Sequence, residues 1–219
     1  MKKQLGLLIC FIALFLNSAF GQNFEDALKS TFTEFESDST FIDKLSSGNR
    51  FELIAQKWND QWIAHYYAAY SEVILSYIEK DEAKRDLYLD KADKQFEQLK
   101  ALLKTDNDEV YVLAAMIANA RLAVKPMARY KKYGDIFNEN IEKAKSFRPD
   151  NPRIYLYQGM SIYHTPKMFG GGPKAALPYF EKAEGLYKNE NDGDIMKPYW
   201  GKRLNAEMLN TCKKEVGNN

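Results

Sequence analysis

The sequence predicts an all-α fold in which antiparallel helical hairpins stack side by side. Apolar residues recur at spacings of three and four through almost the whole chain after residue 22, whereas strand-type alternation is nowhere sustained. Proline, glycine and asparagine mark short connections between these runs, so successive helices must be antiparallel neighbours. With 219 residues, of which 45% are hydrophobic, the chain is long enough to bury one sizeable core.

The N-terminus has the pattern of a secretory signal. Lys2 and Lys3 precede an apolar stretch, and Ala19-Phe20-Gly21 supplies a small-x-small cleavage site. The apolar stretch is about 12 residues, too short to span a bilayer, so a cleaved signal is favoured over a retained anchor. We expect residues 1–21 to be removed and 22–219 to form one exported domain. The periplasm is the favoured location, and an extracellular location is the alternative.

Cysteine usage follows from this signal. Cys10 lies within the apolar stretch without the small residues that precede a lipidation site, and it leaves with the signal. Cys212 then remains alone, so no intramolecular disulfide can form. We expect Cys212 to be a small buried residue on the last helix, with pairing between two chains as the alternative.

The first mature segment predicts a helix followed by half of a repeat. Phe24, Leu28, Phe32 and Phe35 form one apolar stripe. We expect residues 37–39 and 46–49, rich in Ser, Gly and Asn, to interrupt it before the stripe resumes at 51–58. This region would close one end of the stack.

Six further helices follow from periodicity, over residues 62–78, 82–104, 110–124, 136–147, 154–163 and 176–187. Asn107 is a predicted N-cap, Pro126 a predicted helix end, and Pro152 and Pro173 occupy predicted first helical positions. A C-terminal capping helix is predicted from an apolar stripe with basic residues outside it. That stripe comprises Trp200, Leu204, Met208 and Leu209.

Several of these helices share a pattern. Ala92 and Phe96, and again Ala176 and Phe180, match A-x3-F, while Gly159 is a small residue in the helix before the second pair. The chain here resembles the tetratricopeptide repeat (TPR) family over residues 61–215, which implies an α-solenoid of about three repeats. The equivalent positions in successive repeats are residues 92, 137 and 176, which are 45 and 39 residues apart. These repeat lengths exceed the roughly 34 residues of the TPR family and come close to the length of HEAT repeats.

Two narrower resemblances concern shorter segments. Residues 50–55, with Trp62 and residues 66–70, are similar to secreted TPR proteins of Bacteroidetes whose function is not established. The loop at 169–176 is similar to one in the periplasmic T-component of TRAP-type transporters, which associates with a substrate-binding partner.

The sequence offers little chemistry, and we expect neither catalysis nor a metal or cofactor. His65 and His164 lack a second histidine at metal-binding spacing; His164 sits at a predicted helix end, which suits a cationic ring. The acidic loop at 189–194 is too short for an EF-hand, so a linker is favoured over a calcium site. With 31 basic and 30 acidic residues and no basic block, nucleic acid is not an expected partner.

With catalysis, metal binding and nucleic-acid binding not expected, the remaining class of function is binding at a surface of the helical stack. In stacked hairpins the first helix of each repeat lines a concave groove, and we expect that groove to bind a protein or peptide. The predicted groove residues are His65, Tyr66, Tyr70, Val112, Met116, Asn119, Leu156, Met160 and Tyr163. A small-ligand or transport accessory protein is the alternative, and it would need an enclosed cavity. Burial in the core is the other interpretation of these side chains.

The glycine-rich loop is a second candidate surface. Gly170, Gly171, Gly172 and Lys174 would contact a partner or an anion. The alternative is that these glycines only allow the chain to turn between two helices. The sequence leaves the identity of any partner and the oligomeric state open.

Overall fold

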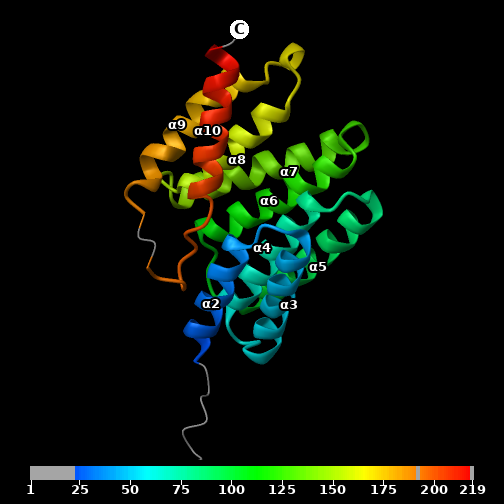
Figure 1. The fold of residues 1–219 in the computed structure, drawn as a ribbon, viewed down its shortest axis with the longest axis vertical. Coiled ribbons are helices and arrows are strands. Elements are labelled where there is room, and N and C mark those ends of the chain that lie inside the picture. Colours follow the sequence, from blue (N-terminus) through cyan, green and yellow to red (C-terminus); the bar gives the residue numbers. More distant parts are fainter. Residues whose placement is uncertain (1–22, 191–192, 218–219) are drawn as a thin grey trace, which may run out of the picture.

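The computed structural model describes residues 23–190 and 193–217, and over these residues it contains helices and no strand. Figure 1 shows the helices as a stack of paired rods. The helices are α2 (Phe24–Ser37), α3 (Phe41–Lys57), α4 (Trp62–Ile78), α5 (Glu82–Leu102), α6 (Asp108–Val124), α7 (Pro126–Phe147), α8 (Pro152–His164), the short 3₁₀ helix η2 (Lys167–Phe169), α9 (Pro173–Tyr187) and α10 (Lys202–Gly217).

Consecutive helices pair as hairpins. The hairpins are α2–α3, α4–α5, α6–α7 and α8–α9, and α10 packs against α9 at the C-terminal end. The first helices α4, α6 and α8 contact one another in series, which joins the hairpins into one hydrophobic core. The predicted all-α stack of hairpins is confirmed. The N-terminal unit is a whole hairpin, where the sequence predicted a helix and half of a repeat.

Several predicted helix ends are confirmed. The side chain of Asn107 accepts a hydrogen bond from the Val110 N–H at 3.0 Å, and Pro152 and Pro173 begin α8 and α9. The predicted start of α7 near residue 136 was wrong, because α7 begins at Pro126 directly after α6 ends. Proline has no N–H to donate, so it can start the second helix as readily as it stops the first.

The predicted interruption at residues 46–49 was also wrong, since α3 runs through it without a break. Both Ser47 and Gly48 are buried there. A Cβ atom added to Gly48 would lie 3.0 Å from Leu75 Cδ1, so the glycine permits close packing of α3 on α4. Ser47 Oγ donates to Asp38 Oδ2 at 2.5 Å. These small residues mark a helix crossing, which a count of turn-forming residues cannot distinguish from a loop.

The close approach predicted at Gly159 is confirmed. A Cβ atom at this position would come within 2.7 Å of Phe180 Cε1, the aromatic residue of the second A-x3-F pattern. Ala176, which begins the same pattern, is also buried. The α8–α9 hairpin therefore packs ring against backbone, and a larger side chain would separate the two helices.

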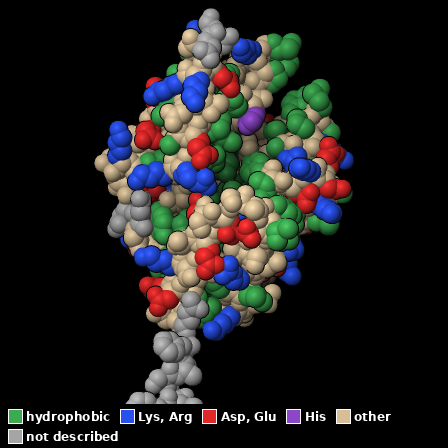
Figure 2. All heavy atoms as spheres, in the orientation of Figure 1, with side chains coloured by type: hydrophobic (Ala, Val, Ile, Leu, Met, Phe, Trp, Pro, Cys, Tyr) green, Lys and Arg blue, Asp and Glu red, His purple; other side chains and the backbone are tan. Residues whose placement is uncertain are grey.

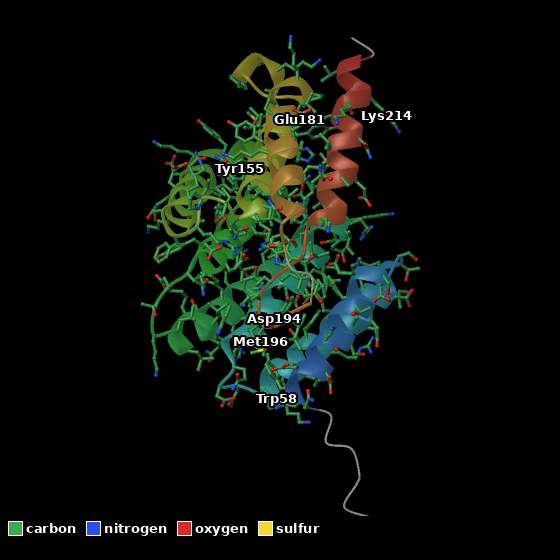
Figure 3. The ribbon with its side chains drawn as sticks, turned by 90° about the vertical axis from the view of Figure 1, so that its left-hand side faces the viewer. Trp58, Tyr155, Glu181, Asp194, Met196 and Lys214 are labelled. Carbon is green, nitrogen blue, oxygen red and sulfur yellow. The ribbon has the colours of Figure 1, made fainter. Side chains whose placement is uncertain are left out.

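Residues 193–201, which connect α9 to α10, form a segment that we call the strap. Figures 1 and 3 show this segment, which carries Asp194 and Met196, beside α2. The ring of Tyr199 lies 5.0 Å from that of Phe32 on α2. Trp200 was predicted to belong to the capping helix, and this was wrong: it precedes α10 and is buried in the strap.

Candidate functional site

A buried ion-pair network centred on Arg153 binds the core to Glu190, which precedes the strap, and to the strap itself. Arg153 is completely buried, and its guanidinium Nη2 donates to Glu109 Oε1 at 2.7 Å and to Glu190 Oε1 at 2.6 Å. Its Nη1 also donates to the Trp200 carbonyl at 3.3 Å. Because the charge of Arg153 is met by two carboxylates, burial costs far less than it would for a lone guanidinium. The network holds α6, α8 and the strap together.

The strap fills the groove that the sequence predicted to be open. The ring of Trp200 lies 4.9 Å from the ring of Tyr70 and 5.9 Å from that of Tyr157. Its Nε1 donates to Tyr66 Oη at 2.9 Å, and α2 covers the neighbouring surface of α4. The inner face of the first helices is consequently core over this half of the stack.

Six of the nine predicted groove residues are therefore buried, and the prediction that they line an open groove was wrong for them. These six are His65, Tyr66, Tyr70, Val112, Met116 and Leu156. The periodicity of a buried helix and of a groove-lining helix is the same, so the pattern could not separate them. Only the packing of distant segments decides the difference.

The remaining three predicted groove residues stay partly exposed, toward the C-terminal ends of the first helices. Asn119 Oδ1 accepts a hydrogen bond from Tyr77 Oη at 2.9 Å, which places it near the end of α4. Tyr163 Oη donates to Glu215 Oε1 at 2.9 Å, and Met160 lies one turn earlier on α8. The structure thus leaves open the part of the inner face that the strap does not reach.

Exposed apolar side chains gather at this open end. Four of them belong to the start of α7 and to η2, and their exposed fractions are 90% for Met127, 66% for Tyr130, 82% for Met168 and 71% for Phe169. Soluble proteins rarely expose large apolar side chains in a group unless the group binds something. These residues are the strongest sign of a binding surface in the described part of the molecule.

Figure 2 shows a hollow between the α8–η2 end and the α6–α7 end, with hydrophobic side chains on both sides and a histidine at its margin. His65 is buried, whereas His164 at the end of α8 is exposed. We call this hollow the cleft. The start of α7, which carries the exposed side chains of Met127 and Tyr130, lies on one side of it. The end of α8 with η2, which carries His164 and the exposed side chains of Met168 and Phe169, lies on the other side.

The state of the His164 ring differs from the sequence expectation. A helix C-terminus favours a cationic ring, but partial desolvation of the exposed His164 ring lowers its pKa below the usual range. The neutral imidazole therefore predominates at pH 7. The ring of Tyr163 meets that of His164 edge-on at 5.1 Å.

The glycine-rich loop shapes the wall of the cleft that carries η2. Gly170 and Gly172 adopt φ of 83° and 95°, and a Cβ on Gly171 would lie 2.1 Å from the Thr165 carbonyl oxygen. All three positions thus require glycine for the turn itself. Beside the loop, Lys167, Lys174 and Val216 border a second hollow of about 560 Å³. The anion or partner contact predicted for Lys174 stays a prediction.

A third hollow of about 320 Å³ lies between α5, α6 and α7. Phe96, Tyr111 and Tyr133 are among its walls. Arg121 at its edge pairs with Asp86 at 3.1 Å and with two further aspartates, so its charge is already neutralised. This hollow offers apolar contact without a free cation.

Other chemistry is sparse in the residues that the structure describes. They hold no group of three or more His, Cys, Asp or Glu side chains arranged for a metal ion. Cys212 is buried, as predicted, and burial raises the pKa of its thiol. Within the same residues, none of the helices combines the length and the apolar character needed to cross a membrane.

Comparison with solved structures identifies similar folds. The fold is similar to the HusA haemophore from Porphyromonas gingivalis, with a TM-score of 0.75 and 28% sequence identity. The match covers 89% of this chain and 95% of the haemophore. No protein-family model and no curated protein matches the sequence.

The chain accordingly shares its fold with a binding protein. Sequence reasoning missed four of the five cleft residues and treated the fifth, His164, only as a helix end. Met127 and Tyr130 lie within three residues of each other, and Met168 is next to Phe169. Apolar residues grouped beside Pro126 and Gly170, outside the helical stripes, were the available signal.

Proposed function

We propose that the protein is an exported carrier that binds haem, or a closely similar flat porphyrin, in the cleft. The observation that carries this proposal is the hollow between the start of α7 and η2, two segments that each carry large exposed apolar side chains: Met127 and Tyr130 on α7, Met168 and Phe169 on η2. The similarity to a haemophore over 89% of the chain supports the choice of ligand.

The chemistry of the cleft suits a broad, flat, apolar ligand. A porphyrin presents two large π-faces, against which aromatic rings and thioether sulfurs pack well. Methionine also adjusts to the outline of a ligand because its side chain is unbranched and flexible. The cleft opens to solvent, so the charged propionates of a haem would remain in water while the ring is covered. An open site also lets a carrier release its ligand to an acceptor.

Protein or peptide recognition in a concave groove has less support. Six of the nine side chains on which that expectation depended are in the core. The proposal therefore belongs to the small-ligand class that the sequence left as the alternative, with an open cleft in place of an enclosed cavity. Relationship to the TPR family is retained as a proposal, supported by the contact between Gly159 and Phe180.

Export is part of the proposal as well. The predicted signal at residues 1–21 lies outside the described residues. A haem carrier would meet its ligand outside the cytoplasm, which agrees with the signal pattern. N-terminal sequencing of the protein recovered from the cell envelope and medium tests this point, and a sequence starting at Gln22 is expected.

A haem titration tests the binding. The chain from residue 22 onward is titrated with ferric haem, and the change in the Soret absorption band gives the affinity. We expect saturable binding at one site, weakened at least about tenfold, or 1.4 kcal/mol, in a Met168→Ser, Phe169→Ser variant. A matched control is Leu53→Ser, Phe147→Ser, which removes exposed apolar side chains from α3 and from the far end of α7. Equal weakening in both variants would overturn the proposed location.

A further inference from the structure

We infer that His164 supplies the nitrogen ligand to the iron when haem occupies the cleft. This inference rests on the proposed function and adds to it a choice between iron-loaded and iron-free porphyrin. It follows from the difference between the two histidines, from the backbone that holds His164, and from the other side chains at hand.

The two histidines have opposite environments. His65 is buried, with Nδ1 2.7 Å from Gln95 Oε1 and Nε2 3.2 Å from the Asn59 carbonyl oxygen, so both of its nitrogens are used inside the fold. His164 is exposed, and neither of its ring nitrogens has a hydrogen-bond partner among the residues that the structure describes. His164 is therefore the histidine with a nitrogen available to a ligand.

The backbone holds His164 firmly at the edge of the cleft. The N–H of Thr165 donates to the Ser161 and Ile162 carbonyl oxygens at 3.2 and 3.1 Å, which ends α8 directly after the histidine. The N–H of Gly172 returns to the Ile162 carbonyl at 2.9 Å and ties the η2 loop to the same point. Because these backbone hydrogen bonds already fix the position of the residue, little further ordering is needed when a ligand binds to its side chain.

Coordination requires a free lone pair, and the ring provides one. Desolvation lowers the pKa of His164, so the neutral form that can coordinate iron predominates at pH 7. Histidine is a common axial ligand of haem iron, and methionine and tyrosine are also used. Among the cleft residues, the thioethers of Met127 and Met168 and the hydroxyl of Tyr130 are the competing donors. An imidazole nitrogen binds ferric iron better than a thioether does, because the ferric ion is the harder acid.

The test compares ferric haem with iron-free protoporphyrin IX on wild type, His164→Gly and Phe169→Ser. Binding is followed by absorption for haem and by fluorescence for the iron-free ring, and resonance Raman spectra of the ferrous form report an iron–histidine stretch. We expect His164→Gly to lose that stretch and to bind haem at least about tenfold more weakly, because even the loss of an outer partner of a metal ligand costs about 10- to 100-fold and this variant loses the ligand itself. Its affinity for the iron-free ring should stay within about twofold of wild type, or about 0.4 kcal/mol.

Added imidazole should restore the haem spectrum of His164→Gly, because the free ring can fill the vacated position. Phe169→Ser should weaken both ligands together. If His164→Gly keeps the iron–histidine stretch and the haem affinity, the inference is wrong while the proposed function stands. If it weakens both ligands equally and imidazole restores nothing, His164 is a wall of the cleft and the inference is again wrong. If wild type binds neither ligand, the proposed function itself fails.

Discussion

Trp200 donates a hydrogen bond from its indole Nε1 to the hydroxyl of Tyr66 at 2.9 Å across 134 residues of sequence. Tyr66 in turn donates to Glu109 Oε2 at 3.0 Å, so the strap, α4 and α6 share one buried polar chain. An open stack of hairpins would have no segment packed on its inner face, so this contact is where the protein differs from one. The strap covers this part of the inner face, while the proposed binding cleft stays open at the other end.

Replacing Trp200 tests the strap as a structural element. Trp200→Ala removes ring contacts with Tyr70 and Tyr157 and leaves a cavity, so we expect a loss of about 3–5 kcal/mol in the free energy of unfolding. Trp200→Phe keeps an aromatic ring and loses the hydrogen bond, and its own cost should be smaller. Urea denaturation measures both. Equal stability of Trp200→Ala and wild type would show that the strap is not part of the core.

The Arg153 network provides a second prediction. Arg153→Met leaves Glu109 with the half-exposed Arg148, 3.2 Å away, as its one remaining guanidinium partner, and we expect it to cost about 3 kcal/mol. Adding Glu109→Gln removes the poorly compensated buried charge and should recover part of that loss. A double-mutant cycle by urea denaturation gives the coupling between the two residues. Additive effects would contradict a shared buried network.

A pair of small-residue substitutions tests the α8–α9 packing. Gly159→Ala places a Cβ 2.7 Å from the Phe180 ring, so we expect destabilisation by about 1–3 kcal/mol. Gly185→Ala is the matched control on α9, because nothing lies within 4 Å of its added Cβ. There the better helix propensity of alanine should raise stability by about 0.5–1 kcal/mol. Thermal unfolding of both variants distinguishes a close approach from a simple propensity effect.

Glu72 predicts a pH dependence of stability. Burial raises its pKa to about 8, and the neighbouring Glu52 adds to the rise while Lys91 opposes it. The unfolded chain releases this proton near pH 4.5 and the folded chain keeps it, so this group makes stability fall as pH rises from about 5 to 8. Glu72→Gln cannot ionise and should lack this component. Urea denaturation at pH 5, 6, 7 and 8 measures it, and identical slopes for wild type and variant would exclude Glu72 as its source.

The hairpin stack was predictable because helical periodicity and caps are local properties. Asn107, Pro152 and Pro173 mark helix starts through their own backbone requirements, and Gly159 reports a close approach through its missing side chain. The predicted helix end at Pro126 is confirmed, but its second role as the first residue of α7 was missed, because one proline can both end one helix and begin the next.

The location of the open surface was not predictable. Whether Tyr66 and Tyr70 are exposed depends on Trp200, which reaches them only after the last hairpin has folded back. The start of α7 near residue 127 and η2 near residue 168 lie on the two sides of the cleft but share no helical stripe. No spacing in the sequence links two hairpin ends, so their proximity becomes visible only in the assembled stack.

Mapping the bound ligand on the protein would show whether the cleft is the porphyrin site. We would record ¹H–¹⁵N spectra of the chain from residue 22 onward during titration with gallium protoporphyrin IX, a diamagnetic analogue of ferric haem. We expect saturable shifts at the end of α8, in η2 and at the start of α7, around His164, Phe169 and Met127. Shifts concentrated in the hollow between α5, α6 and α7, or no shifts at all, would contradict it.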